Sequence, residues 1–359
     1  MRNLRRSACA GTLCAGSSSA LHALAFRRNL VDLLHGFALP LVALVLPWRL
    51  TFAVYRGLAH LPLFSVRVAM FLAGIRRTRE VDPGAARHLA WRHRLYLLLE
   101  TGDAALAQVR GPRWMRRHLM RIGDFPRGPD SYVAIFFHYG TGLWGIRAMA
   151  EHGRPARLVG RPIDSEGLRD RPFMRRYGEW RYDVAARAGR GPIIFWGGAR
   201  KQIGAALATG QAVLGAVDVP PTETHSLSPV TLLGRPTHFT HGLVEIAAQA
   251  GVPLVVFCVG LSEDARERVL EVSAPIIAAG RPMVDVMQEL ATHLDRHIAR
   301  DPAGWYLWGW LDAFFAPDAW SFANAVVAPA TSPEPSCETG EREEDAQLDL
   351  PNSANPMAP

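Results

Sequence analysis

A histidine directly follows a predicted buried strand near the middle of the chain. Residues Tyr132–Phe137 form a continuous apolar run rich in β-branched and aromatic side chains, which predicts a buried strand. His138 comes next, glycines interrupt the pattern, and Leu143–Ala150 resumes apolar residues at helical spacing. Open α/β sheets bind their ligands at this junction. Because histidine titrates near neutral pH, His138 is either a general base for a hydroxyl nucleophile or a residue that caps the turn.

Two more polar residues follow predicted strands. Arg161 comes after the run Arg157–Val159, and Asp218 ends the strand predicted over Ala212–Val217. The carboxyl ends of neighbouring parallel strands lie at one edge of a sheet, so these side chains can converge on His138. Asp218 is alternatively a turn residue before Val-Pro-Pro, and an arginine among so many is alternatively part of a solvated face.

Short apolar runs alternate with helical segments through the central part of the chain. This alternation predicts an α/β fold with a central mixed sheet flanked by helices, in one domain over residues 61–320. The further expected elements are strands at 191–196 and 252–259, helices at 199–208 and 242–250, and a hairpin at 230–236. Neither a G-x-S-x-G motif nor a phosphate loop is present.

An apolar segment near the N-terminus predicts contact with a membrane. Residues 1–30 are interpreted as disordered or as an over-extended start, and residues 31–60 as a hydrophobic membrane anchor. The uncharged stretch Gly36–Trp48 is short for a spanning helix and contains two prolines, and Arg49 follows it closely. An interfacial anchor on anionic headgroups is therefore expected; a core helix and a full span are the alternatives.

The charge of the chain is unevenly distributed. Residues 331–359 carry seven acids and one arginine, and subtracting that net charge of −6 from the formal +7 leaves +13 on residues 1–330. Such a surface suits anionic partners, among them a phospholipid face, a phosphate-bearing substrate or an acidic carrier protein. Nucleic acid ranks last because no recognition module is present. The segment 326–359 is expected to be an acidic disordered tail.

Neither a metal nor a cofactor is expected. The four cysteines form no ligand pattern, and His225, His238 and His241 lie in predicted loops without an acid cluster.

Several motifs occur in the same order as in one acyltransferase family. The stretch His138–Trp144, HYGTGLW, resembles the histidine motif of the lipid A late acyltransferases of the lauroyl/myristoyl type, relatives of the glycerolipid acyltransferases. The resemblance covers roughly residues 35 to 315. Its other motifs are Arg161-Pro162, Arg176-Tyr177-Gly178, Gly210–Asp218, Leu233-Gly234 with Thr240-His241-Gly242, Ala247–Phe257 and Trp305–Trp310.

One departure from the family pattern concerns the acid of that motif. The family places Asp or Glu five positions after its histidine, where this chain has Leu143, which cannot accept a hydrogen bond. Another acid can replace it in space: Asp218 is the first candidate, and Asp164 and Glu151 are weaker ones.

The resemblance implies a membrane-associated acyltransferase on the cytoplasmic face of a bacterial inner membrane. His138 would activate an acceptor hydroxyl, which attacks an acyl thioester on acyl carrier protein or coenzyme A. Arg161 and Arg176 would bind phosphate groups of the substrates. The acceptor would be a membrane lipid or glycolipid, as in lipid A synthesis. The alternatives are a specialised acyltransferase of a pigment or secondary lipid, and a non-catalytic lipid- or carrier-binding homologue, which Leu143 favours.

Overall fold

The computed structural model describes residues 26–127, 130–151, 154–221 and 226–315. The predicted acidic tail, residues 326–359, therefore lies outside the described residues. The predicted N-terminal segment, residues 1–30, lies outside them as far as residue 25. His225 also lies outside the described residues.

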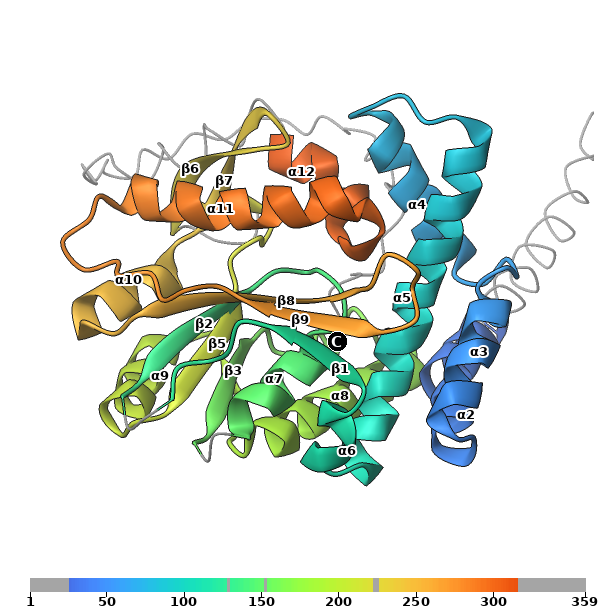
Figure 1. Ribbon diagram of the computed structural model, residues 1–359, viewed down its shortest axis with the longest axis horizontal. Coiled ribbons are helices and arrows are strands. Elements are labelled where there is room, and N and C mark those ends of the chain that lie inside the picture. Colours follow the sequence, from blue (N-terminus) through green and yellow to red (C-terminus); the bar gives the residue numbers. More distant parts are fainter. Residues whose placement is uncertain (1–25, 128–129, 152–153, 222–225, 316–359) are drawn as a thin grey trace, which may run out of the picture.

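The core of the protein is a seven-stranded mixed sheet in the order β1-β9-β8-β2-β5-β3-β4 (Figure 1). Only β8 and β9 pair antiparallel, and every other neighbouring pair is parallel. The predicted α/β class with a mixed sheet is thus confirmed. The strands are β1 Leu119–Ile122, β2 Tyr132–Phe136, β3 Ala156–Gly160, β4 Ile194–Phe195, β5 Ala212–Ala216, β8 Leu254–Leu261 and β9 Arg268–Val272.

Helices cover both faces of this sheet, and alternate strand residues point to opposite sides. On one face Val133 and Val213 pack with helices α9, α10 and α11. On the other face Ala134 and Leu214 pack with α7 and α8, where Trp144 is fully buried. The helices are α7 Gly142–Ala150, α8 Pro172–Gly189, α9 Ala199–Ala208, α10 Gly242–Ala250 and α11 Met283–Arg300.

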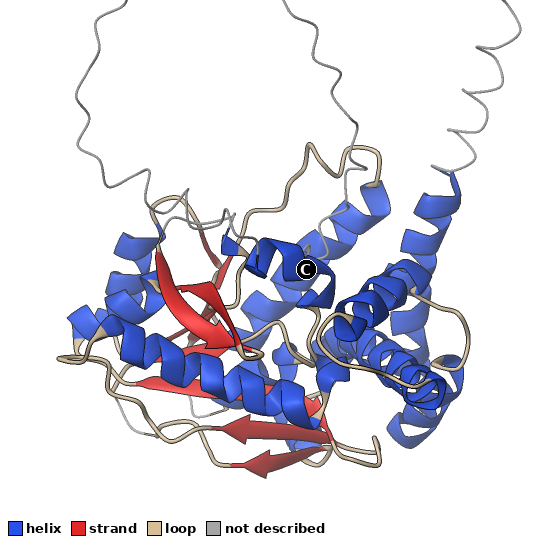
Figure 2. Ribbon diagram, turned by 90° about the horizontal axis from the view of Figure 1, so that it is seen from above, coloured by secondary structure: helices blue, strands red, loops and turns tan. Residues whose placement is uncertain are grey.

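A smaller two-stranded hairpin is separate from the main sheet (Figure 2). Strands β6 Leu227–Leu232 and β7 Arg235–Thr240 form an antiparallel pair, as the sequence predicted for this region. After α11 the chain continues through η3 Pro302–Gly304, η4 Leu307–Trp310 and α12 Leu311–Phe315.

The longest helix, α5 Pro83–Val109, connects the N-terminal helices to the sheet (Figure 1). Asp82 starts it: its carboxylate accepts hydrogen bonds from the backbone N–H groups of Gly84 and Ala85 at 2.8 and 3.0 Å, which lowers the pKa of Asp82. The remaining helices of this part are η1 Leu34–Ala38, a π-helical turn, α2 Leu39–Val45, α3 Trp48–Leu58, α4 Ser65–Arg76 and α6 Pro112–Arg116.

The segment predicted as a membrane anchor, residues 31–60, packs partly against α5. Tyr55 is fully buried, and its hydroxyl donates to the carbonyl of Leu39 at 2.7 Å. Other apolar side chains of this segment face outward, with Leu41 55% and Val45 77% exposed. Within the described residues one helix, Phe26–Val45, is long and apolar enough to cross a membrane by length and composition.

Candidate active site

His138 and Asp218 meet at the carboxyl edge of the sheet, as the sequence predicted. Strands β2 and β5 are parallel neighbours in which Phe136 pairs with Ala216, so the residues two positions further along each strand also lie side by side. The Nδ1 atom of His138 lies 2.9 Å from Oδ1 of Asp218. The aspartate side chain is fully buried, whereas 23% of the histidine side chain is exposed. The pair therefore combines a buried carboxylate with a partly accessible imidazole.

The contacts of Asp218 fix the histidine in one orientation and one tautomer. Its carboxylate accepts the backbone N–H of His138 at 2.9 and 3.1 Å, besides the ring contact at Nδ1. The indole Nε1 of Trp305 donates to Oδ2 at 3.0 Å. Because an ionised carboxylate only accepts hydrogen bonds, the neutral ring carries its proton on Nδ1, and Nε2 is the nitrogen that can act as a base.

The segment around Trp305 also holds the turn that carries His138. The backbone N–H of Tyr306 donates to the His138 carbonyl at 2.8 Å, and its hydroxyl donates to the carbonyl of Gly140 at 2.9 Å. The N–H of Gly140 in turn donates to the carbonyl of Gly304 at 2.9 Å. These contacts fix the position of the histidine backbone relative to Trp305.

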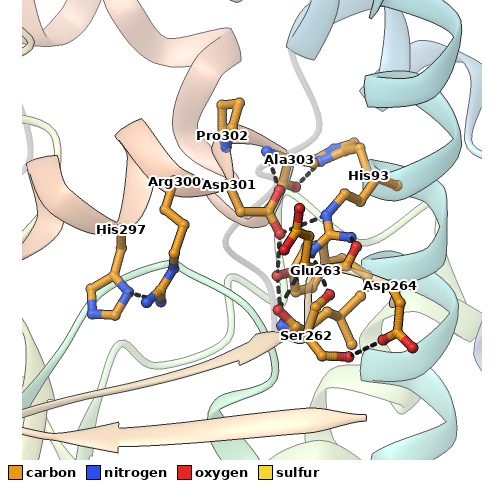
Figure 3. A network of polar contacts seen from close by, with 12 residues as sticks. His93, Ser262, Glu263, Asp264, His297, Arg300, Asp301, Pro302 and Ala303 are labelled. Atoms are coloured by element: carbon orange, nitrogen blue, oxygen red, sulfur yellow. Dashed lines mark hydrogen bonds and ion pairs between the residues drawn. The ribbon is translucent and has the colours of Figure 1, made fainter. Parts of the chain in front are cut away.

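A polar network secures the start of this segment at Asp301 (Figure 3). The carboxylate of Asp301 accepts from the guanidinium of Arg92 at 2.8 Å and from the hydroxyl of Tyr96 at 2.7 Å, both on α5. Next to it His93 contacts the carbonyl of Ala303 at 2.8 Å, and burial lowers the pKa of His93 to about 4. Helix α5 and the sheet edge are thereby joined behind the histidine turn.

Gly140 is required by the geometry of that turn. Its φ angle is +65°, in the left-handed region, and a Cβ atom at this position would lie 1.8 Å from the carbonyl oxygen of Val259. Only glycine fits such a close approach to another strand.

The other predicted acids lie away from the His138 side chain. Leu143, which occupies the position of the family's motif acid, is partly buried in the first turn of α7. Glu151 follows the opposite end of α7 and pairs with Arg121 at 2.7 Å. Asp164 accepts the backbone N–H of Gly167 at 2.8 Å in an exposed turn. Among the candidate orienting acids, Asp218 is the one that contacts the histidine.

His138 opens onto a cavity of about 1910 Å³. Its walls combine apolar side chains from the helices with arginines. Leu143, Ile146 and Phe136 lie on the apolar wall near the histidine, and Arg161 lies on the same cavity. The carbonyl of Arg161 accepts from the hydroxyl of Tyr182 at 2.6 Å, and burial raises the pKa of Tyr182 to about 12.

Arg176, the other predicted phosphate ligand, does not line the cavity. Its side chain is 73% exposed and lies 3.4 Å from Glu179. The same helix instead directs Tyr177 and Arg181 into the cavity. Arg181 pairs with Glu100 at 2.9 Å.

The charged side chains along the cavity wall are mainly cationic. Three of its arginines are paired with a carboxylate: Arg171 with Asp32 at 2.7 and 3.0 Å, Arg181 with Glu100 at 2.9 Å, and Arg200 with Glu245 at 3.2 Å. The wall includes seven arginines and three acids, namely Arg27, Arg28, Arg67, Arg161, Arg171, Arg181 and Arg200 with Asp32, Glu100 and Asp170. The cavity therefore suits an amphiphilic ligand with negative charge.

Sequence reasoning assigned no role to Trp305, Asp301 or the ion pairs of the cavity. The tryptophan-rich run Trp305–Trp310 could have indicated that one of its indoles is buried and donates a hydrogen bond to an acceptor, as Trp305 does. No group of three or more His, Cys, Asp or Glu side chains that could hold a metal ion occurs among the described residues.

Comparisons with known proteins add little to this geometry. No protein-family model matches the chain, and no curated protein matches it. Among solved structures, the 1-acyl-sn-glycerophosphate (LPA) acyltransferase PlsC from Thermotoga maritima is similar over 71% of this chain and 99% of its own, with 14% sequence identity and a TM-score of 0.33. A similarity that low carries no activity over to this chain, so the site has to be interpreted from its own residues.

Proposed function

We propose that the protein is a membrane-associated acyltransferase that moves a fatty acyl chain from a thioester to a lipid or glycolipid hydroxyl. The observation that carries the proposal is the contact of 2.9 Å between His138 and the buried Asp218 at a large cavity with apolar and cationic walls. A base at such a cavity can meet both a hydroxyl and an acyl chain.

In the proposed reaction Nε2 of His138 accepts the proton of the acceptor hydroxyl as its oxygen attacks the thioester carbonyl. The carbon–sulfur bond of the tetrahedral intermediate then breaks, and the imidazolium returns the proton to the departing thiolate. Asp218 lowers the energy of the imidazolium by its negative charge and keeps the ring oriented, which is the role of the acid in a histidine–carboxylate pair.

The donor would be acyl carrier protein, or coenzyme A, and the acceptor a membrane lipid. Both kinds of substrate join an apolar chain to phosphate groups, which the cavity's apolar wall and Arg161 can accommodate. The exposed apolar residues of α2, among them Leu41 and Val45, support binding of the N-terminal helices to an anionic membrane surface. A location on the cytoplasmic face of a bacterial inner membrane follows from such a donor and surface.

Leu143 favours a second candidate. An apolar side chain in place of the motif acid fits a homologue that binds lipid or carrier protein without catalysis, or an acyltransferase specialised for a pigment or secondary lipid. The non-catalytic homologue requires that replacing His138 leave the binding of lipid or carrier protein unchanged.

The proposed function is tested by acyl transfer to a total bacterial lipid extract. Full-length protein is incubated with labelled acyl chains on acyl carrier protein or on coenzyme A, and the products are identified by mass spectrometry. Transfer from at least one donor that is lost in His138→Ala supports the proposal. Tight binding of the extract or of the carrier by folded wild type, without transfer from either donor, would favour the binding protein instead.

A further inference from the structure

Arg67 and Trp310 are two further polar residues of the cavity, and neither takes part in the proposed reaction of the His138–Asp218 pair. Both residues line the cavity. Arg67 lies on α4 and Trp310 ends η4, and these two elements are in contact. The backbone of Gly74 on α4 lies against the carbonyl of Trp308, where a Cβ atom would be 2.3 Å from the oxygen. Nearer to the two residues, a Cβ atom at Gly309 would lie 3.1 Å from the Cβ atom of Met70. Met70 is three positions after Arg67 on α4 and Gly309 directly precedes Trp310, so both residues flank this contact between the two elements.

Arg67 has no ion-pair partner among the described residues, in contrast to its neighbours. Arg171 and Arg181 on the same cavity are each paired with a carboxylate, at 2.7 and 2.9 Å. The positive charge of Arg67 adds to burial in lowering the pKa of His35 to about 4. This part of the wall thus carries a positive charge that no described carboxylate balances.

Trp310 contributes a hydrogen-bond donor without an acceptor. Its indole Nε1 is buried and contacts no acceptor among the described groups. A buried donor of this kind costs free energy unless a partner is supplied. A ligand in the cavity that presents an oxygen acceptor would supply it.

We propose that Arg67 and Trp310 form a subsite for the anionic, oxygen-bearing head group of the amphiphile that this protein binds. The guanidinium would pair with the negative charge, and the indole N–H would donate to one oxygen. Exposed apolar residues that line the same cavity, such as Leu34 and Val66, are available to the chain of the ligand. The inference rests on the proposed function in that the same cavity holds His138, and it restricts the substrate to an anionic amphiphile.

The test is equilibrium binding by calorimetry of full-length protein with decyl phosphate, and with decanol as its neutral counterpart. Wild type should prefer decyl phosphate by about 10-fold or more, and Arg67→Gln should lose most of that preference without weakening decanol binding. Trp310→Phe, which keeps a ring and removes the N–H, should weaken decyl phosphate about 3- to 10-fold. Arg67→Lys should retain part of the preference, and Arg79→Gln, outside the cavity, should bind like wild type.

Three results would overturn the subsite. Arg67→Gln could bind decyl phosphate like wild type, or Arg79→Gln could weaken it equally, which would indicate general surface charge. The third is displacement of decyl phosphate by an equal concentration of inorganic phosphate. Burial of the decyl chain should make the affinity for decyl phosphate about 100-fold or more higher than that for inorganic phosphate, so equal competition would contradict an amphiphile site. An Arg67-dependent preference without any acyl transfer would keep the subsite and reject the acyltransferase. Acyl transfer together with decyl phosphate binding that does not depend on Arg67 would keep the acyltransferase and reject the subsite.

Discussion

Replacing Asp218 by asparagine removes the charge from the His138–Asp218 pair and leaves its size almost unchanged. In the wild type the carboxylate lies 2.9 Å from Nδ1 of His138, is fully buried, and also accepts from Trp305 at 3.0 Å. The amide can accept from only one side, so the hydrogen bonds to the ring and to the indole cannot both persist. The imidazolium formed during the reaction would lose the negative charge next to its Nδ1 atom.

The size of the effect follows from the separation of the charges. Two unit charges about 4 Å apart interact by about 4 kcal/mol at the effective dielectric constant of a partly buried site. Loss of that stabilisation in the transition state corresponds to a rate about 10³-fold lower. We therefore expect kcat of Asp218→Asn to fall by about three orders of magnitude and KM to change little, because Asp218 is buried and does not line the cavity.

Steady-state acyl transfer measures this effect, with Asp164→Asn, an exposed turn aspartate, as the matched control. The His138→Ala background separates catalysis from folding. If Asp218 acts through the histidine, Asp218→Asn should cost almost nothing further when His138 is already absent. The reasoning would be refuted if Asp218→Asn kept more than about a tenth of the wild-type kcat, well above the value that the lost charge interaction implies. A full additional loss in the double variant would mean a purely structural role.

Three further predictions concern neighbouring residues. Leu143→Ala should leave kcat within about 3-fold of wild type, because the orienting acid is Asp218; a loss of 100-fold or more in steady-state assays would assign Leu143 an essential role. Trp305→Phe should lower kcat about 10-fold at unchanged KM, since one charge-assisted hydrogen bond to Asp218 is lost; a higher KM with unchanged kcat would contradict this. Burial lowers the pKa of His93 from 6.5 to about 4, so the unfolded state takes up its proton first as the pH falls, and stability decreases between these values. Urea unfolding should show a loss of about 2 kcal/mol from this residue between pH 7.5 and pH 5, and a smaller loss in His93→Gln.

The parts of the site on the parallel strands could be predicted from the sequence because their positions depend on local pattern. The strands before His138 and Asp218 are short apolar runs, and parallel strands present their carboxyl ends together whatever their order in the sheet. The last two strands at one side of the sheet, β1 and β9, were not predicted, because Leu119–Ile122 and Arg268–Val272 mix charged and apolar residues without a strong run. Helix α11 was also not predicted.

The contacts that cross the fold could not be predicted in this way. Trp305 bonds to Asp218 across 87 positions of sequence, and no periodicity relates the two. The orientation of α8 was also not available from the arginine pattern. Tyr177 and Arg181, four residues apart, share the face toward the cavity, while Arg176 points outward. Choosing between these arginines requires the packing of the helix, which the sequence motif does not contain.

The most direct test of the account is a single-turnover measurement of acyl transfer by wild type and His138→Gln, with substrate binding measured on the same preparations. Glutamine keeps a polar side chain at the cavity and cannot act as a base. The account predicts that His138→Gln binds donor and acceptor like wild type and transfers the acyl chain at least about 10³-fold more slowly. Transfer by His138→Gln at the wild-type rate would contradict it.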